Sequence, residues 1–142
     1  FDVTKPQWKR IPAGNSFDYP IDYWMRILGH NVESGRIDFL TRWAPNSYCH
    51  YHRHLGETTS VVIEGEHHLH SESPTETHIK VRRPGSVSRA PAGDFHMEKG
   101  GPEGSLLFFS MECKDTYAFE ILDVDGKAIA ALKCSDFVAG TY

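Results

Sequence analysis

Glycine, proline and asparagine residues divide this chain of 142 residues into many short segments rich in β-branched and aromatic residues. Such segments predict strands joined by tight turns. The expected strands are residues 36–44, 60–64, 77–82, 105–111, 117–122 and 127–132. Asp125–Gly126 is a strong hairpin signal between the last two, and the glycine-rich segment 100–104 predicts another turn. Many short strands separated by such turn-forming residues favour an all-β sandwich or barrel.

Outside these strands, little regular structure is expected. Residues 1–20 have the turn signals of an irregular N-terminal arm, with Trp8 and Phe17 as its anchors. We expect residues 21–142 to form a single domain with one core. A single helical turn near the C-terminus could begin at a cap formed by Ser135 or Asp136.

Composition excludes several classes of partner. The net charge is −4 and no basic block is present, so nucleic acid is not expected as a partner. No apolar stretch approaches the roughly 20 residues of a membrane span, so no membrane association is expected. The three cysteines, Cys49, Cys113 and Cys134, are few and widely spaced. This pattern disfavours a disulfide framework and predicts a reducing, cytoplasmic location.

Three histidines are spaced as metal ligands on strands would be. His52 and His54 lie two residues apart, so on a strand their side chains share one face. His96 follows a segment of glycines and a proline, and could reach the same point from a neighbouring strand. Neutral imidazoles suit iron, zinc, copper and nickel. The pattern therefore predicts a metal site built from three histidines.

Two motifs resemble those of the cupin superfamily. The spacing Gly85-x5-Pro91-x-Gly93-x2-His96 resembles the second cupin motif, and His52-x-His54 with the later Gly65 resembles the first. The resemblance implies a single-domain antiparallel β-barrel of the jelly-roll type with minor helix. The first motif normally has a glutamate five residues after its second histidine, where this chain has Thr59. The resemblance therefore implies a three-histidine site without that carboxylate.

Two further segments, residues 51–56 and 122–130, resemble the small cupin dioxygenases that cleave β-diketones, the acetylacetone dioxygenase group, and the related dihydroxyacetophenone dioxygenases. This resemblance implies an Fe(II) dioxygenase that cleaves a carbon–carbon bond in a ketone or enolate substrate with O₂. It implies His52, His54 and His96 as metal ligands and catalytic residues, with no other cofactor. Zn(II) or Ni(II) could replace iron in recombinant protein, because affinity follows the Irving–Williams order.

Alternatives remain open at this point. A site built on His50 and His52 would place Glu57 at an acceptable spacing for a fourth ligand, although the distance to Gly65 favours His52 and His54. The function could instead be that of a zinc-binding sensor resembling the cupin domains of anti-sigma factors, or of a metal-dependent isomerase or hydrolase.

Other histidines and one carboxylate could support the site. Glu98 has the strand parity of His96, and we expect it beside the metal or at the pocket rim. A second cluster contains His67, His68 and His70, and a structural or site-supporting role is expected for at least one of His68 and His70. Small cupins often pair their exposed sheet edges, so a homodimer is also expected.

Overall fold

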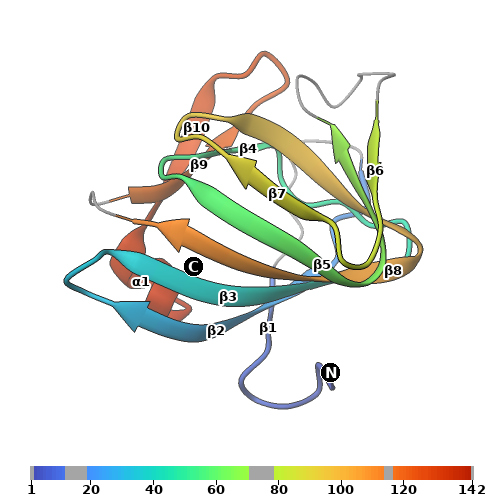
Figure 1. Ribbon diagram of the computed structural model, residues 1–142. Coiled ribbons are helices and arrows are strands. Elements are labelled where there is room, and N and C mark those ends of the chain that lie inside the picture. The colour runs from blue at the N-terminus through green and yellow to red at the C-terminus, as the bar shows by residue number, and fades with distance from the viewer. Residues whose placement is uncertain (1, 12–18, 71–78, 114–116, 142) are drawn as a thin grey trace.

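The computed structural model describes residues 2–11, 19–70, 79–113 and 117–141, and within them strands dominate (Figure 1). One short helix, α1 (Cys134–Ala139), follows the last strand. The strands are β1 (Lys9–Arg10), β2 (Tyr23–Asn31), β3 (Arg36–Trp43), β4 (His52–His54), β5 (Thr58–His70), β6 (Lys80–Arg82), β7 (Val87–Ala90), β8 (Phe95–Glu112), β9 (Tyr117–Leu122) and β10 (Ala128–Lys133).

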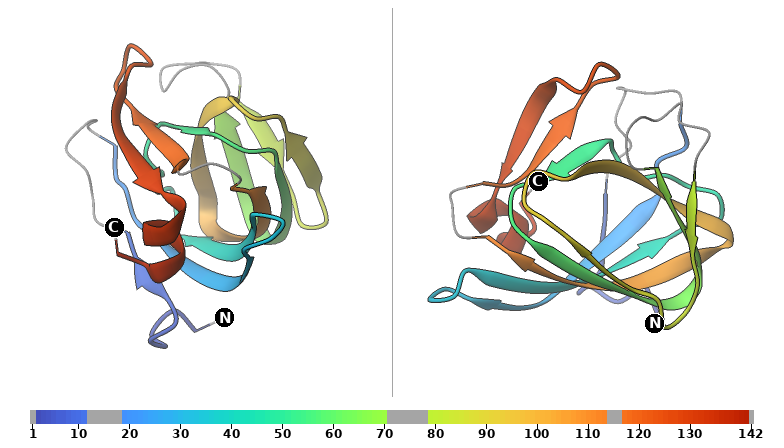
Figure 2. Two further views of the ribbon diagram at one scale, coloured as in Figure 1. Left: turned by 90° about the vertical axis from the view of Figure 1, so that its left-hand side faces the viewer. Right: turned by 45° about the horizontal axis from the view of Figure 1, so that its top comes forward.

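The named strands pair antiparallel and form one curled sheet. Its main path runs β1-β2-β3-β8-β4-β9-β10, and β5 pairs with β6, β7 and β8 off this path. The right-hand view of Figure 2 shows the sheet curled round on itself. The expected all-β barrel of the jelly-roll type, with minor helix, is confirmed.

Strand β8 organises the barrel because it pairs with three other strands. It contacts β3, β5 and β4 along its length. The expected turn at residues 100–104 is wrong, since this segment continues the strand. Its glycines are needed for close backbone approach: a Cβ atom on Gly100 would lie 2.8 Å from the Cβ of Trp43, and one on Gly101 would lie 2.8 Å from that of Glu66. The glycines therefore let a continuous strand cross against its neighbours.

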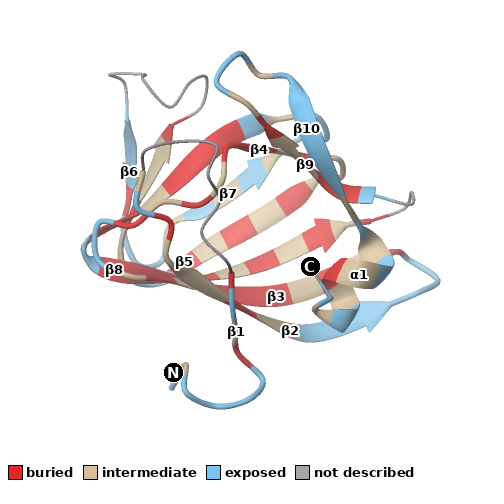
Figure 3. Cartoon of the chain, turned by 180° about the vertical axis from the view of Figure 1, so that it is seen from behind, coloured by how far each residue is buried: buried red, intermediate tan, exposed pale blue. Residues whose placement is uncertain are grey.

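Alternation along β3 separates two apolar layers. Phe39 and Trp43 belong to the main core inside the barrel, and Figure 3 shows the alternating burial along the strands. Leu40 faces the other way and packs with Trp8 and Leu106 in a second cluster. Trp8 thus anchors the N-terminal segment, as expected. Phe17 and residues 77–78 of an expected strand lie outside the described residues.

The C-terminal part forms a hairpin and the helix. Strands β9 and β10 pair antiparallel around Gly126, whose φ is 78°, as the hairpin signal predicted. Helix α1 buries Phe137 completely against the main core. Its N-cap is Lys133, which makes no side-chain cap hydrogen bond, so the expected cap at Ser135 or Asp136 is wrong. The helix is positioned by burial of its aromatic side chain.

A disulfide joins Cys113, just after β8, to Cys134, the first residue of α1. The expectation from cysteine spacing is therefore wrong for this pair, because spacing does not reveal which residues the fold brings together. Cys49 is a buried free thiol.

Among the described residues, no helix is long and apolar enough to cross a lipid bilayer. The division of the chain at residue 20 stays a prediction.

The disulfide is expected to stabilise the fold, because it closes a loop with a sequence separation of 21 residues. Replacing both cysteines by serine should lower the free energy of unfolding by about 3 kcal/mol, measured by urea denaturation. Reductant should destabilise the wild-type protein by a similar amount and leave the double variant unchanged. A wild-type protein insensitive to reductant would contradict the expectation.

Candidate metal centre

Strands β4 and β8 bring the three expected histidines together. His52 is paired directly with His96 in the antiparallel register, and His54 lies two residues further along β4. The Nε2 atoms of His52 and His54 are 3.0 Å apart, and those of His54 and His96 are 3.1 Å apart. All three side chains are buried. Their ring nitrogens therefore converge on one point inside the barrel.

The Nδ1 atoms of His52 and His96 each face an oxygen that can only accept a hydrogen bond. His52 Nδ1 lies 2.7 Å from the backbone carbonyl oxygen of His50. His96 Nδ1 lies 3.2 Å from Oδ2 of Asp94. A carbonyl or carboxylate accepts hydrogen bonds, so in both rings Nδ1 carries the proton. The neutral form of each ring then has its lone pair on Nε2, directed at the cluster.

The same tautomer follows for His54. Its Nδ1 is 3.0 Å from Oγ1 of Thr58. The hydroxyl of Thr58 donates its proton to the carbonyl of Gly56 at 3.1 Å, so its oxygen accepts from His54 Nδ1. When all three rings are neutral, their Nε2 lone pairs meet at one place, where a cation would relieve their mutual repulsion. This donor set fits a divalent transition metal.

Glu98 adds a carboxylate to the cluster. Its Oε2 is 3.8 Å from His52 Nε2 and 3.6 Å from His96 Nε2. Its Oε1 accepts a hydrogen bond from His67 Nε2 at 3.0 Å, and Nδ1 of His67 is 3.0 Å from Ser105 Oγ. The ligand atoms of the three histidines and Glu98 all lie within 4.8 Å of one another, so these four residues could hold one metal ion.

The carboxylate beside the three histidines is Glu98, and neither Glu57 nor the residue at position 59 takes that place. Glu57 faces Arg89, with 3.8 Å between its Oε1 and the arginine Nε, and is not part of the cluster. Thr58 is the β5 residue that contacts His54, and Thr59 lies at the next position, where the side chain points to the opposite face. Strand parity had identified the direction of Glu98, but only the pairing of β4 with β8 shows its nearness to the histidines.

The remaining histidines divide between the pocket and the periphery. His50 precedes β4, and its Nδ1 lies 3.5 Å from the hydroxyl of Tyr23. His67 reaches the site through Glu98, whereas His68 pairs with Glu66 at 2.6 Å. His70 is buried, and its ring lies 6.1 Å from that of Tyr48 between centroids. The contact with Glu98 thus belongs to His67, and the supporting role expected for at least one of His68 and His70 stays a prediction.

Burial and charge set the protonation of the site. Burial, with the nearby charge of His96, lowers the pKa of His52 to about 4 and that of His54 well below its usual value. Burial also opposes the charge on His96, but hydrogen bonds and charges from Asp94 and Glu98 raise its pKa to about 9. Burial would raise the pKa of Glu98, but hydrogen bonds from two histidines hold it well below its usual value. Without a bound cation, His96 therefore keeps a proton at neutral pH and Glu98 is ionised.

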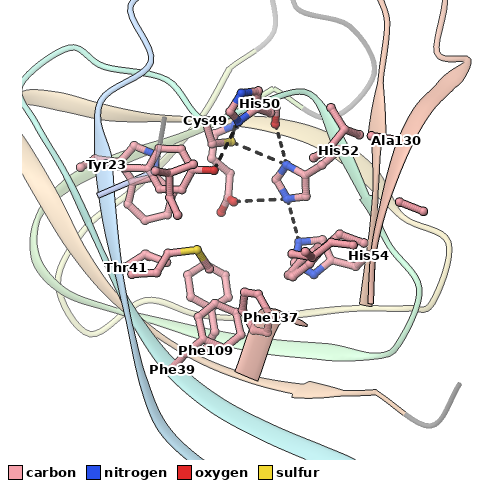
Figure 4. Close-up of a pocket in the computed structure, with 18 residues that line it drawn as sticks. Tyr23, Phe39, Thr41, Cys49, His50, His52, His54, Phe109, Ala130 and Phe137 are labelled. Atoms are coloured by element: carbon pink, nitrogen blue, oxygen red, sulfur yellow. Dashed lines mark hydrogen bonds and ion pairs between the residues drawn. The ribbon is translucent and has the colours of Figure 1, made fainter. Parts of the chain in front are cut away.

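A partly open pocket of about 280 Å³ adjoins the histidine cluster. Figure 4 shows His52 and His54 at one side of it, with Phe39, Phe109 and Phe137 gathered below them. His52, His54 and Glu98 line the pocket, and most of the remaining lining is apolar. We call this space the apolar pocket. It can hold a small, largely apolar molecule that reaches the metal site with a polar group.

Metal affinity is expected to depend on pH through His96, because the metal must displace its proton. Below pH 9 or so, where His96 with its pKa of about 9 holds a proton, apparent Ni(II) affinity should rise roughly tenfold per pH unit, with release of about one proton. Calorimetry in buffers of different ionisation enthalpy measures both quantities. Asp94→Asn removes a charge that raises the pKa of His96, so its profile should shift to lower pH. Affinity that is independent of pH in this range would contradict the expectation.

No family model and no curated protein matches the sequence. Solved structures do match. An acetylacetone dioxygenase from Acinetobacter johnsonii is 15% identical with a TM-score of 0.68, and the match covers 93% of this chain and 83% of that one. A candidate acetylacetone dioxygenase from Methylibium petroleiphilum is 16% identical with a TM-score of 0.72, covering 94% and 86%. An RmlC-like cupin from Ralstonia eutropha is 14% identical with a TM-score of 0.67, covering 94% and 78%. The chain therefore has the cupin fold.

Proposed function

We propose that this protein is an Fe(II)-dependent dioxygenase that cleaves a carbon–carbon bond in a β-diketone or aryl-ketone-like substrate. The observation that carries the proposal is the convergence of three imidazole Nε2 atoms beside a largely apolar pocket. The likeness to an acetylacetone dioxygenase supports it at the level of the fold. His52, His54 and His96 are the proposed metal ligands.

The charge of the ligand set favours an anionic, chelating substrate. Three neutral imidazoles add no negative charge to a divalent metal, and the enolate of a β-diketone offers two oxygens and a negative charge to it. When bound, iron would supply substrate orientation, Lewis acidity and the electrons for reaction with O₂. The protein's own residues do the rest: they hold the imidazoles in one tautomer and exclude water with an apolar pocket.

Glu98 is not one of the proposed metal ligands. The hydrogen bond from His67 occupies its Oε1, and its Oε2 lies farther from the histidine nitrogens than these lie from one another. We therefore assign Glu98 as a negative charge beside the metal, and not as a required ligand. This charge orients the proton-bearing groups around the site, above all His67.

The expected partners are the ketone substrate and O₂. The cytoplasmic location stays a prediction, and so does the homodimer, which light scattering at micromolar concentration would test.

Metal content should separate the proposed ligands from Glu98. His96→Ala should lose stoichiometric metal after iron-supplemented expression, because two imidazoles remain. Glu98→Gln should keep it, because the three imidazoles remain in place. His30→Ala is the matched control, since His30 is exposed on β2. Elemental analysis measures all three. Full metal occupancy in His96→Ala, or metal loss in Glu98→Gln, would contradict the assignment.

Activity is the direct test of the proposed function. Iron-loaded protein should consume O₂ with a β-diketone or hydroxylated aryl ketone and yield two carbonyl or carboxyl fragments. Adding the diketone without O₂ should produce a visible absorption band, and His52→Ala should abolish it. Simple monoketones should react poorly, because they cannot chelate through two oxygens. Iron-loaded protein with neither band nor O₂ uptake across such a panel would instead favour the zinc-binding sensor.

A further inference from the structure

Helix α1 supplies one wall of the apolar pocket through Phe137, which is completely buried. Its ring centroid lies 5.0 Å from that of Phe39 and 5.1 Å from that of Phe119. Both of these rings also line the pocket, and the ring centroids of Phe119 and His54 are 5.0 Å apart. Figure 4 shows Phe137 at the same side of the pocket as Phe39. Movement of α1 away from the barrel would therefore remove a wall of the pocket.

Helix α1 is too short to be stable by itself. It has six residues, whereas isolated helices shorter than about 12 residues are only marginally stable in water. Its N-cap, Lys133, makes no side-chain cap hydrogen bond. The preceding strand, β10, lies at the end of the sheet, pairs with β9 and is mostly exposed. The position of α1 therefore depends on its contacts with the barrel.

Two of these contacts come from one face of the helix. Cys134 and Phe137 are three residues apart, so their side chains lie on the same face. The disulfide joins Cys134 to Cys113, and Phe137 packs in the main core. On the barrel side, the N–H of Cys113 donates a hydrogen bond to the carbonyl of Gly35 at 2.6 Å, which holds the chain just after β8. The disulfide therefore ties α1 to the barrel one helical turn before Phe137.

The three metal-binding histidines are supported by other parts of the chain. They lie on β4 and near the start of β8, whereas Cys113 follows the far end of β8. Strand β4 pairs with β8 and β9. The oxygens that face the three Nδ1 atoms belong to His50, Thr58 and Asp94. Displacement of α1 would therefore leave the histidine cluster in place.

We propose that the Cys113–Cys134 disulfide is a redox-sensitive latch, which holds α1 and Phe137 in the wall of the apolar pocket. Cys134 is half-buried, so local motion of α1 is sufficient to admit a small dithiol. The dithiol breaks the sulfur–sulfur bond: the two cysteine sulfurs together gain two electrons and two protons, and the dithiol is oxidised to its own disulfide. Reduction then frees α1 and opens the pocket. The latch acts whichever ligand the pocket takes, so it is independent of the dioxygenase proposal.

Cys49 reports on the opening of the pocket, because it lines the pocket, is 2% exposed and has a free thiol. Purified protein is treated with iodoacetamide, and alkylation of Cys49 is followed by mass spectrometry of its peptide. The rate should be at least about tenfold higher in Cys113→Ser/Cys134→Ser than in oxidised wild-type protein, because loss of the disulfide favours opening. Wild-type protein reduced with dithiothreitol and desalted should match the double variant. The double variant itself should not respond to dithiothreitol.

Urea separates release of α1 from unfolding of the whole barrel. Release of a six-residue helix exposes little surface, so the alkylation rate of the double variant should change less than about twofold up to about 1 M urea. Alkylation through global unfolding would rise by roughly fivefold or more over the same range. Calorimetry should find the Ni(II) affinity of the double variant within about threefold of wild type, because the histidine cluster stays in place.

Phe137→Ala tests whether the latch acts through the pocket wall. With the disulfide intact, this variant should already alkylate Cys49 faster than wild-type protein. Adding the two serine substitutions should then accelerate alkylation by much less than about tenfold, because the wall is open in both forms. Val138→Ala is the matched control, since Val138 packs against the core but is not among the described residues that line the pocket. It should keep the slow oxidised rate and the full response to reduction.

Several results would overturn the latch. Equal alkylation rates in oxidised wild-type protein and the double variant would show that the pocket stays closed without the disulfide. A steep dependence on urea would show that the disulfide only stabilises the whole fold. A full tenfold response in the Phe137→Ala background would remove Phe137 from the latch, and loss of Ni(II) affinity in the double variant would show that the metal site moves with α1. Absence of O₂ uptake would leave the latch standing, and failure of the latch would leave the dioxygenase proposal standing.

Discussion

Hydrogen bonds at the Nδ1 atoms of three imidazoles are the interactions on which the rest of this site depends. Each acceptor lies near its histidine in the chain: a carbonyl two residues before His52, a hydroxyl four residues after His54 and a carboxylate two residues before His96. Local backbone geometry therefore fixes which nitrogen carries the proton. Long-range pairing of β4 with β8 only has to bring the three Nε2 atoms together.

Burial of the site strengthens these hydrogen bonds and requires that its polar groups be paired. Charged and polar groups inside an apolar core are stable only when their hydrogen bonds are complete. Glu98 meets this condition through His67, which in turn contacts Ser105. The network therefore extends from the metal centre into the core behind it.

Local signals in the sequence were sufficient for much of the fold. Alternation, the Asp125–Gly126 turn and the two histidine motifs each depend on neighbouring residues, and the strands, hairpin and histidine cluster follow from them. Features that depend on contacts between distant parts of the chain could not be predicted from the sequence. The glycines of 100–104 look like a turn until the strands packed on them are known. The Cys113–Cys134 bond and the contact of Glu98 with two histidines depend on packing that spacing does not encode.

The residues of the metal centre and some of the residues that line the pocket come from separate parts of the chain. The histidines lie on β4 and β8, whereas Phe119 and Phe137 belong to the C-terminal hairpin and helix. Insertions and replacements in the C-terminal part can change the shape of the pocket without moving the Nε2 atoms of the three histidines. A one-residue slip in β8 would instead turn His96 away from the barrel interior. Divergence within such a scaffold would therefore alter ligand preference far more readily than metal coordination.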